Sequence, residues 1–378
     1  MTRLVYICDW LPPDFGAVGQ YAMLDARERA KEGFAVTLVG LTSGSSARLR
    51  AEPIGRGSLE LIKVRRRPCP KQNFAARMLW TVFSNLRLVV AAWRPMRRAA
   101  SILFTGSPPL MLHFIAPLNI LLRKRLIYRI MDFHPECLIA ERGRSNIALD
   151  LVLRLTWFWR RRTDEFEVLG LDQARRLAEI GIGQERIRIR RNPSPTGFPP
   201  GLARLPLPDA LAGSTGVILY SGNWGVAHDE TTFIEAYAHY VSRSKRPLRF
   251  WLNAVGAKAD AVETMLTTRG VPVYRSRLLP VSDLARLLLA ADVHLVTLRD
   301  SFVGYVLPSK IHACIESGRR ILFVGSAQSD VHFLATRALS GNRYRRVDVG
   351  DVAGLITALF DMERDVANER AVVPEGAG

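Results

Sequence analysis

The sequence predicts an α/β protein built from two doubly wound, Rossmann-like domains. The chain has 378 residues, enough for two domains that each bury a core of their own. Strand-like and helix-like segments alternate along the chain, as they do in parallel sheets that are covered by helices. Residues 193–215 are rich in proline and glycine and show neither a helical nor a strand periodicity. This stretch is expected to be a linker between the two halves.

The first half, residues 1–192, contains short apolar segments that are typical of buried strands. We expect them near residues 3–8, 35–40, 59–64, 101–105, 125–131, 165–169 and 186–190. Segments with apolar residues three or four positions apart predict helices near 18–32, 72–93, 109–122, 146–162 and 171–180. Because the two kinds of segment alternate, the strands are expected to pair in parallel.

The second half, residues 216–363, repeats this alternation. Strands are expected near 217–221, 248–253, 271–275, 292–297 and 320–324. Helices are expected near 229–241, 258–268, 282–290, 309–317, 328–336 and 351–363. Residues 364–378 are expected to form a charged tail beyond the last helix, as chain ends often do.

Two segments of the second half have the features of a phosphate site. In VILYSGNWGVAHD, residues 217–229, an apolar strand precedes Gly222 and Gly225, which permit a sharp turn and a close approach to a ligand. In LPSKIHACIESG, residues 307–318, Lys310 falls in the first turn of a helix, where a lysine is unfavourable unless an anion is bound. Together the segments predict a diphosphate at the carboxyl ends of the strands.

The order of these motifs resembles a known family. The motifs that carry the resemblance are, in order, YSGN-x-G-x-AHD, ADVHLVTLR, PSK, and ESG followed by an apolar strand. The chain resembles GT-B glycosyltransferases, most closely the family 4-like type of bacterial surface-polysaccharide synthesis. The similarity is clearest over residues 215–330 and looser over 4–22 and 125–136. It implies two Rossmann-like domains that face each other across a cleft, the first for the acceptor and the second for a nucleotide sugar.

The resemblance implies a donor that is a nucleotide sugar, with UDP as the expected nucleotide, and no cofactor. Such transfer needs positive charge or hydrogen-bond donors at the departing diphosphate, because negative charge grows on its oxygen. The residues expected there are Lys310, Ser309, Gly222, Asn223, Gly225 and Arg299, the last after the strand 293–298. The alternatives are a solvated surface lysine and a plain tight turn.

The chain departs from the family pattern at two cationic positions. Many relatives carry an arginine directly after the first glycine and a lysine five residues later, where this chain has Asn223 and His228. More of the diphosphate charge would then fall to Lys310 and Arg299. Alternatively, donor binding would be weaker and, because the imidazole of His228 titrates near neutral pH, would depend on pH.

The chain also lacks the family's pair of glutamates. Tyr305 and Ala313 stand at the expected positions. Glu316 lies three residues after Ala313, near the same helix face, and is the residue expected to replace one of them at the donor sugar.

The segment MDFHPE, residues 131–136, follows an apolar strand of the first half. Asp132 is the candidate for the acceptor-side base or for stabilising the sugar centre, with His134 as a second candidate and Glu136 expected beside them. An aspartate that caps a helix before Pro135 is the alternative. An inverting reaction would need Asp132 as a base, whereas a retaining one needs no enzymic nucleophile, and the residues leave both open.

Asp14, Gly16 and Gly19 form the first loop between a strand and a helix. The resemblance implies that this loop borders the acceptor and the donor phosphate. A purely structural turn is the alternative, since glycines are common wherever the chain turns tightly.

The charge of the chain is strongly positive and unevenly distributed. Its net charge is +18, and residues 61–131 contain fourteen Lys or Arg and no Asp or Glu. Helix 72–93 is amphipathic and flanked by arginines, which predicts contact with an anionic membrane surface. An ordinary helix packed on the sheet is the alternative. No nucleic-acid motif is recognisable, so no nucleic-acid partner is expected.

The remaining features concern location and metals. Prolines interrupt the most apolar run, residues 103–122, so no membrane span is expected, and the N-terminus does not resemble a signal peptide. Four dispersed cysteines fit a reducing cytosol, and no metal-binding spacing or DxD pair occurs. We therefore expect a metal-independent enzyme, peripheral on the cytoplasmic side of the inner membrane.

The expected reaction is transfer of a sugar from the nucleotide donor to a lipid-linked saccharide in bacterial polysaccharide biosynthesis. Two other functions remain open from the residues. One is a sugar-nucleotide epimerase of the same fold, and the other is a non-catalytic relative that binds a nucleotide sugar.

Overall fold

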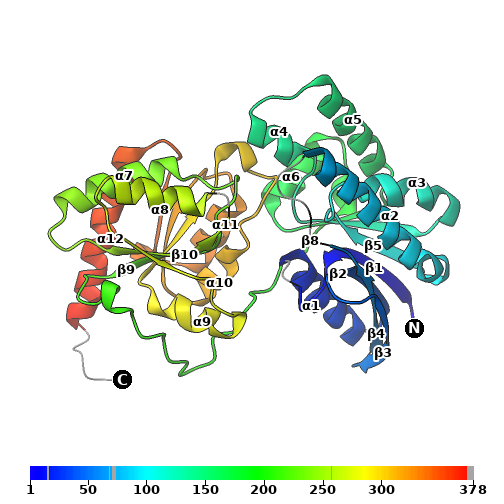
Figure 1. Ribbon diagram of the computed structural model, residues 1–378, viewed down its shortest axis with the longest axis horizontal. Helices are drawn as coiled ribbons and strands as arrows, with labels where there is room; N and C mark the ends of the chain where they lie inside the picture. Colours follow the sequence, from blue (N-terminus) through cyan, green and yellow to red (C-terminus); the bar gives the residue numbers. More distant parts are fainter. Residues whose placement is uncertain (15–16, 68, 70–73, 257, 373–378) are drawn as a thin grey trace. The chain divides into compact units, whose positions relative to one another are not determined.

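The computed structural model describes residues 1–14, 17–67, 69, 74–256 and 258–372 (Figure 1). The chain divides into two compact units, residues 1–191 and 192–378. Each unit contains one sheet with helices packed on it, and the helix-to-strand alternation expected from the sequence is present in both.

The first unit has an eight-stranded sheet in the order β3-β4-β2-β1-β5-β6-β7-β8. Its strands are β1 (Arg3–Trp10), β2 (Ala35–Thr42), β3 (Ala47–Ile54), β4 (Gly57–Arg65), β5 (Ser101–Thr105), β6 (Arg125–Ile130), β7 (Glu165–Val168) and β8 (Ile187–Ile189). All neighbours pair in parallel except β3 and β4, which form an antiparallel hairpin. The sheet order reverses between β1 and β5, so ligands are expected at the carboxyl ends of these two strands.

The helices of the first unit cover both faces of this sheet. They are α1 (Ala17–Lys31), α2 (Phe74–Arg98), α3 (Leu112–Leu122), α4 (Glu136–Arg142), α5 (Ile147–Arg161) and α6 (Leu171–Glu179). Figure 1 shows α1 on one face and α2, α3 and α5 on the other, as right-handed crossovers require. Buried side chains of β1, β2 and α1 form one core cluster, which includes Leu4, Tyr6, Leu38, Ala22 and Ala26.

The second unit has a six-stranded, all-parallel sheet in the order β11-β10-β9-β12-β13-β14. Its strands are β9 (Val217–Asn223), β10 (Arg249–Val255), β11 (Val273–Ser276), β12 (Val293–Thr297), β13 (Arg320–Val324) and β14 (Tyr344–Val347). Its helices are α7 (Thr231–Arg243), α8 (Ala259–Thr268), α9 (Val281–Ala290), α10 (Lys310–Glu316), α11 (Asp330–Ala338) and α12 (Val352–Val372). This is the 3-2-1-4-5-6 Rossmann order, which reverses between β9 and β12.

Three elements escaped the sequence analysis. Strand β3 is a largely exposed edge strand with many polar residues, so it lacks an apolar pattern. Helix α4 has only seven residues, and β14 only four, so each is too short to show a period.

The final helix runs further than expected, since α12 continues to Val372 and residues 364–372 are not a tail. Its polar second half is held by ion pairs to other parts of the unit, which local periodicity does not reveal. These pairs are Arg320–Glu369 at 2.5 Å, Arg345–Asp365 at 2.7 Å and Arg370–Asp292 at 2.8 Å.

Apolar side chains of the connecting stretch pack against the second sheet. Leu211 is buried there, and Phe198, Leu205 and Leu207 lie against the same cluster. Part of the stretch is therefore packed against the second unit, although it contains no long helix or strand.

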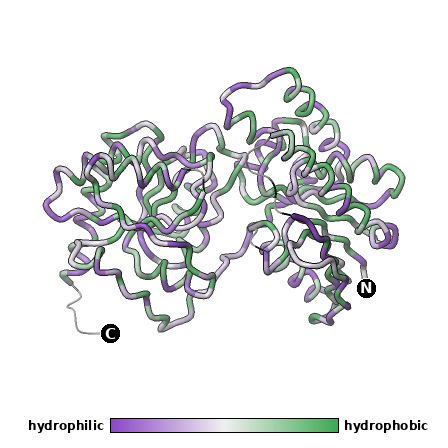
Figure 2. Tube along the Cα trace, viewed as in Figure 1, coloured by the Kyte–Doolittle hydropathy of each residue, from purple (hydrophilic) through white to green (hydrophobic). Residues whose placement is uncertain are grey.

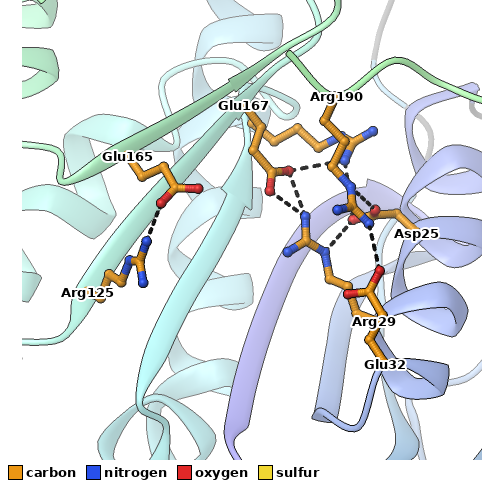
Figure 3. A network of polar contacts seen from close by, with 8 residues as sticks. Asp25, Arg29, Glu32, Arg125, Glu165, Glu167 and Arg190 are labelled. Atoms are coloured by element: carbon orange, nitrogen blue, oxygen red, sulfur yellow. Dashed lines mark hydrogen bonds and ion pairs between the residues drawn. The ribbon is translucent and has the colours of Figure 1, made fainter. Parts of the chain in front are cut away.

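A buried ion-pair network fastens α1 to the strands beyond the centre of the first sheet (Figure 3). Arg29 contacts Asp25 and Glu167, each at 2.7 Å, and Arg129 contacts Glu167 at 3.1 Å. Arg190, directly after β8, contacts Asp25 at 2.7 Å. Although burial opposes it, the arginines lower the pKa of Asp25. The network compensates the buried charges, as stable buried pairs require.

Within the described part of the chain, no helix combines the length and the apolar character that crossing a bilayer requires.

Candidate functional site

The point where the second sheet reverses its order brings together the end of β9, the end of β12 and the start of α10. Gly222 near the end of β9 has φ +116°, a backbone conformation that favours glycine strongly. A Cβ at Gly222 would lie 3.9 Å from Cε of Lys310. Gly222 and Lys310 thus lie next to each other.

Lys310 is the first residue of α10, and its ammonium group is buried. Nζ lies 3.2 Å from the centroid of the Tyr220 ring and has no hydrogen-bond partner among the described residues. Burial lowers the pKa of Lys310 to about 7. A desolvated ammonium without an anion is costly, so the alternative of a solvated surface lysine does not describe Lys310.

His228 lies next to this lysine but carries no charge of its own. Its Nδ1 is 2.6 Å from the carbonyl oxygen of Thr297 and donates to it, which leaves Nε2 free as an acceptor. Burial, followed by the nearby charge of Lys310, lowers the pKa of His228 to about 3. The prediction that His228 makes donor binding pH-dependent is therefore wrong, because the group that titrates near neutral pH is Lys310.

Arg299 differs from Lys310 in having a partner. Its guanidinium contacts both carboxylate oxygens of Glu230, at 3.0 and 3.1 Å, and Lys258 contacts the same carboxylate. The backbone N–H of Arg299 donates to the carbonyl of Ala227 at 2.9 Å. Arg299 thus joins the end of β12 to the loop after β9 and to the start of α7.

The other predicted donor residues occupy more peripheral positions. Asn223 is exposed, and its Oδ1 would meet a Cβ at Gly256 at 2.1 Å. Ser309 precedes α10 without a side-chain capping bond. Glu316 is exposed at the other end of α10, six residues or about 9 Å from Lys310, so the structure does not bring these two together. A Cβ added at Gly225 would lie 3.4 Å from Nδ2 of Asn223.

Tyr220 is a residue of this site that the sequence analysis missed. Its ring lies against the Lys310 ammonium on one side and stacks on Trp224, with 3.8 Å between the ring centroids. The available signal was the period of the strand, since residues 220 and 222 point to the same face of β9. An aromatic residue two positions before the first glycine therefore belongs to the floor of the site.

A second group of polar side chains lies where the first sheet reverses its order. Ser107, after β5, donates to Oδ2 of Asp9 at 2.7 Å, while Oδ1 of Asp9 has no partner among the described residues. Burial, with a smaller contribution from the charge of Asp132, raises the pKa of Asp9 to about 6. Burial also raises the pKa of Asp132 and lowers that of His134. Perturbed groups of this kind mark candidate acid–base sites.

Asp9 escaped the sequence analysis although its signal resembles that of Asp132. Each aspartate ends an apolar strand, in YICD for Asp9 and in YRIMD for Asp132. Asp132 does not cap the next helix, because the residue at the start of α4 is Pro135 and no side chain caps it. The capping alternative for Asp132 is therefore excluded.

Glu136 acts on His134 through its charge, but its carboxylate is paired with a residue outside this group. It forms a buried ion pair with Arg160 of α5, with 3.1 Å between Nη2 and Oε2. Arg160 also donates to the carbonyl of His134 at 3.2 Å, and its guanidinium lies 4.9 Å from the Phe133 ring centroid. Glu136 and Arg160 thus hold the loop after β6, which carries Asp132.

We expect Arg160→Met to lower the free energy of unfolding by about 3–5 kcal/mol, because it leaves the Glu136 carboxylate buried and unpaired. Urea denaturation would measure the loss. Adding Glu136→Leu to the same chain should recover most of it, since both charges are then absent. Arg161→Met, at the exposed neighbouring position, is the control and should change stability little. A small effect of Arg160→Met would contradict the anchoring role.

The first strand–helix loop has a structural role at the positions that are described. Asp14 accepts hydrogen bonds from Oγ1 of Thr42 at 2.8 Å and from the backbone N–H of Ser43 at 3.0 Å. Although burial opposes it, these bonds lower the pKa of Asp14. A Cβ at Gly19 would lie 1.6 Å from the carbonyl oxygen of Trp10, so α1 packs this closely on β1 only with glycine. Gly16 lies outside the described residues.

The described side chains include no cluster of three or more His, Cys, Asp or Glu residues that could bind a metal ion.

Sequence comparison finds no matching family model and no significantly similar curated protein. Solved structures similar to the whole chain include sucrose-phosphate synthase from Thermosynechococcus elongatus, with 13% identity, a TM-score of 0.66 and coverage of 97% of this chain and 91% of that one. Anabaena Alr3699/HepE in complex with UDP-glucose has 12% identity, a TM-score of 0.62 and coverage of 98% and 94%.

An α,α-trehalose-phosphate synthase (UDP-forming) from Burkholderia vietnamiensis is similar to the same extent. It has 13% identity, a TM-score of 0.63 and coverage of 98% of this chain and 95% of that one. At such identities the similarity concerns the fold, and all three are GT-B glycosyltransferases. With parallel sheets in both units and these neighbours along its whole length, the protein has the GT-B fold with two Rossmann-like domains.

Proposed function

We propose that the protein is a metal-independent glycosyltransferase that uses a nucleotide-sugar donor, with UDP as the expected nucleotide. One observation supports the proposal most strongly, the buried ammonium of Lys310 that has no hydrogen-bond partner among the described residues. It lies at the reversal point of a Rossmann sheet, where nucleotide ligands bind. Among the similar structures, Anabaena Alr3699/HepE is a complex with UDP-glucose.

The chemistry follows from the charge of the leaving group. As the bond to the sugar breaks, the departing diphosphate gains negative charge, and a cation held beside it lowers the barrier. Lys310 supplies this cation, and the backbone beside Gly222 can approach a phosphate closely. The bound diphosphate would raise the pKa of Lys310 and keep it charged.

On the acceptor side we propose Asp132, with His134 beside it and Asp9 behind it. Burial raises the pKa of the Asp132 carboxyl group, which makes it a stronger base than an exposed aspartate. Asp132 would take the acceptor proton in an inverting reaction or steady the sugar centre in a retaining one. The anomeric configuration of the product distinguishes the two.

We further propose that the acceptor is a lipid-linked saccharide and that the protein binds the cytoplasmic face of the inner membrane peripherally, in bacterial exopolysaccharide or O-antigen synthesis. Helix α2 supports this role. Leu88, Ala92 and Met96 are buried, as expected for an ordinary helix packed on the sheet. Leu79 and Val90, in contrast, are 59% and 67% exposed. Because α2 is apolar on both sides and carries arginines, it fits an anionic lipid surface.

Labelled UDP-, GDP- and dTDP-sugars, incubated with the protein and a membrane extract, would test the proposal. We expect label from one donor to enter the lipid fraction. Free sugar or nucleotide without lipid labelling would instead indicate an epimerase. Donor binding without turnover of any donor would indicate a non-catalytic protein, consistent with the absence of the family's glutamate pair.

A further inference from the structure

A basic pocket with a volume of about 660 Å³ lies in the first unit, away from the candidate site. It is formed where α3 leads into β6 and α5 leads towards β7, and its lining includes Arg123, Lys124, Arg125, Trp159 and Arg162. These positions are at the amino ends of the strands, whereas Asp132 follows the carboxyl end of β6. The six residues of β6 separate the two edges by about 20 Å.

The turn that forms one wall of this pocket is held rigidly. The side chain of Asn119 donates to the carbonyl of Lys124 at 2.7 Å and accepts from the N–H of Lys124 at 3.1 Å. Arg123 lies between them with φ 50° and ψ 44°, the left-handed conformation in which glycine usually ends a helix. A residue with a side chain is disfavoured there. An arginine nevertheless occupies this position and places a cation at the pocket.

Most of the positive charge in the pocket is not neutralised by carboxylates. Arg125 forms an ion pair with Glu165, and a carboxylate oxygen of Asp164 accepts from the N–H of Leu126 at 2.7 Å. Among the described residues, the side chains of Arg123 and Lys124 form no ion pair. Arg162 lies 3.6 Å from the Phe158 ring centroid and has no ion pair with any residue that the structure describes. An anion would therefore find three unpaired cations around one cavity.

The surface around the pocket is apolar. Helix α3 contacts α2 on one side and α5 on the other, and hydrophobic residues recur along all three helices (Figure 2). Ile120 and Leu121, directly before the basic turn, are 61% and 78% exposed. Leu151, Leu155 and Phe158 of α5 are exposed as well. Apolar side chains beside cations match the acyl layer and the anionic headgroups of a membrane better than they match a soluble anion or nucleic acid.

We propose that this pocket binds the phosphate-bearing headgroup of an anionic lipid, while Ile120 and Leu121 insert into the acyl layer. Arg123 and Lys124 would contact the phosphate, and Trp159 would lie at the level of the headgroups. The inference rests on the proposed membrane association but concerns a site separate from donor and acceptor. It makes α3 and α5, and not α2 alone, part of the membrane-facing surface.

Sedimentation with vesicles tests this site. The double variant Arg123→Gly, Lys124→Gln removes two cations, and glycine also relieves the left-handed position, so folding should not suffer. Each cation near an anionic surface contributes about 1 kcal/mol, so we expect partitioning onto phosphatidylglycerol vesicles to fall about 30-fold. The matched control is Arg27→Gln, Arg56→Gln, which removes the same charge from exposed positions on α1 and the β3–β4 turn.

Three results would overturn the proposal. The first is a control variant whose partitioning onto vesicles falls as much as that of the pocket variant. The second is a pocket variant that partitions like wild type. The third is inorganic phosphate that binds in the pocket as tightly as the protein binds to vesicles. Glycosyl transfer to a detergent-dispersed acceptor should be the same in wild type and pocket variant. If transfer is not observed in either, the vesicle result still decides the lipid site by itself.

Discussion

Lys310→Met should lower the rate of glycosyl transfer about 10²- to 10³-fold, as loss of one group that stabilises a developing oxyanion typically does. The same substitution should raise the melting temperature near pH 7. Burial without a hydrogen-bond partner lowers the pKa of this lysine from 10.5 to about 7, so its charge destabilises the folded protein. Methionine has a similar length and no charge. Calorimetry and initial rates measure the two effects.

Lys245→Met is the matched control, because Lys245 is exposed. It should alter neither the rate nor the melting temperature appreciably. If Lys310→Met instead lowers stability and leaves the rate intact, Lys310 supports the fold and does not bind the donor.

The lowered pKa also fixes how Lys310 responds to pH. Since the folded pKa lies below the unfolded one, its destabilising effect is complete below about pH 7 and fades as pH rises towards 10.5. The gain in stability from Lys310→Met should shrink over the same range. UDP binding by the wild type should take up a proton above pH 7 and weaken about tenfold per pH unit. Calorimetry in buffers of different ionisation enthalpy would detect this uptake, which the variant should lack.

Asp132→Asn should reduce the rate of transfer about 10²- to 10⁴-fold, the range typical of a group that moves a proton in the transition state. UDP binding should stay within about twofold of wild type, since Lys310 and Gly222 belong to the other unit. Titration calorimetry with UDP and initial-rate measurements with a labelled donor distinguish these two quantities.

Two further variants sharpen this test. Asp9→Asn removes the group next to Asp132 whose pKa is raised to about 6, so an acidic limb of the rate profile that reports Asp9 should disappear. Asp150→Asn, at an exposed position of α5, should leave the rate unchanged. A rate for Asp132→Asn close to wild type would remove Asp132 from the mechanism.

Local patterns in the sequence were sufficient for the fold class and most elements. Apolar runs and helical periods predicted the central strands and the large helices, because burial on both faces of a parallel sheet shapes each segment locally. Gly222 and Lys310 were found for the same reason, since turn geometry and helix ends have short-range signals. Strand β3 was missed because it is exposed and polar, and the second half of α12 because ion pairs to distant residues hold it.

The state of the site residues was decided by tertiary contacts alone. Burial lowers the pKa of Lys310, whose ammonium lies on the Tyr220 ring. Burial and the charge of Lys310 keep His228 neutral, while the carbonyl of Thr297, 69 residues away, fixes the orientation of its ring. Contacts across 24 and 98 residues likewise pair Glu136 with Arg160 and Asp9 with Ser107.

The sequence by itself determined that the chain forms two parallel α/β units and where the turns after their central strands lie. Only the tertiary structure decided which cations and carboxylates stay unpaired and which titrate near neutral pH. The physical reason is that hydrophobic periodicity and turn preference depend on neighbours in the chain. Desolvation and ion pairing depend on groups that folding brings together from far apart.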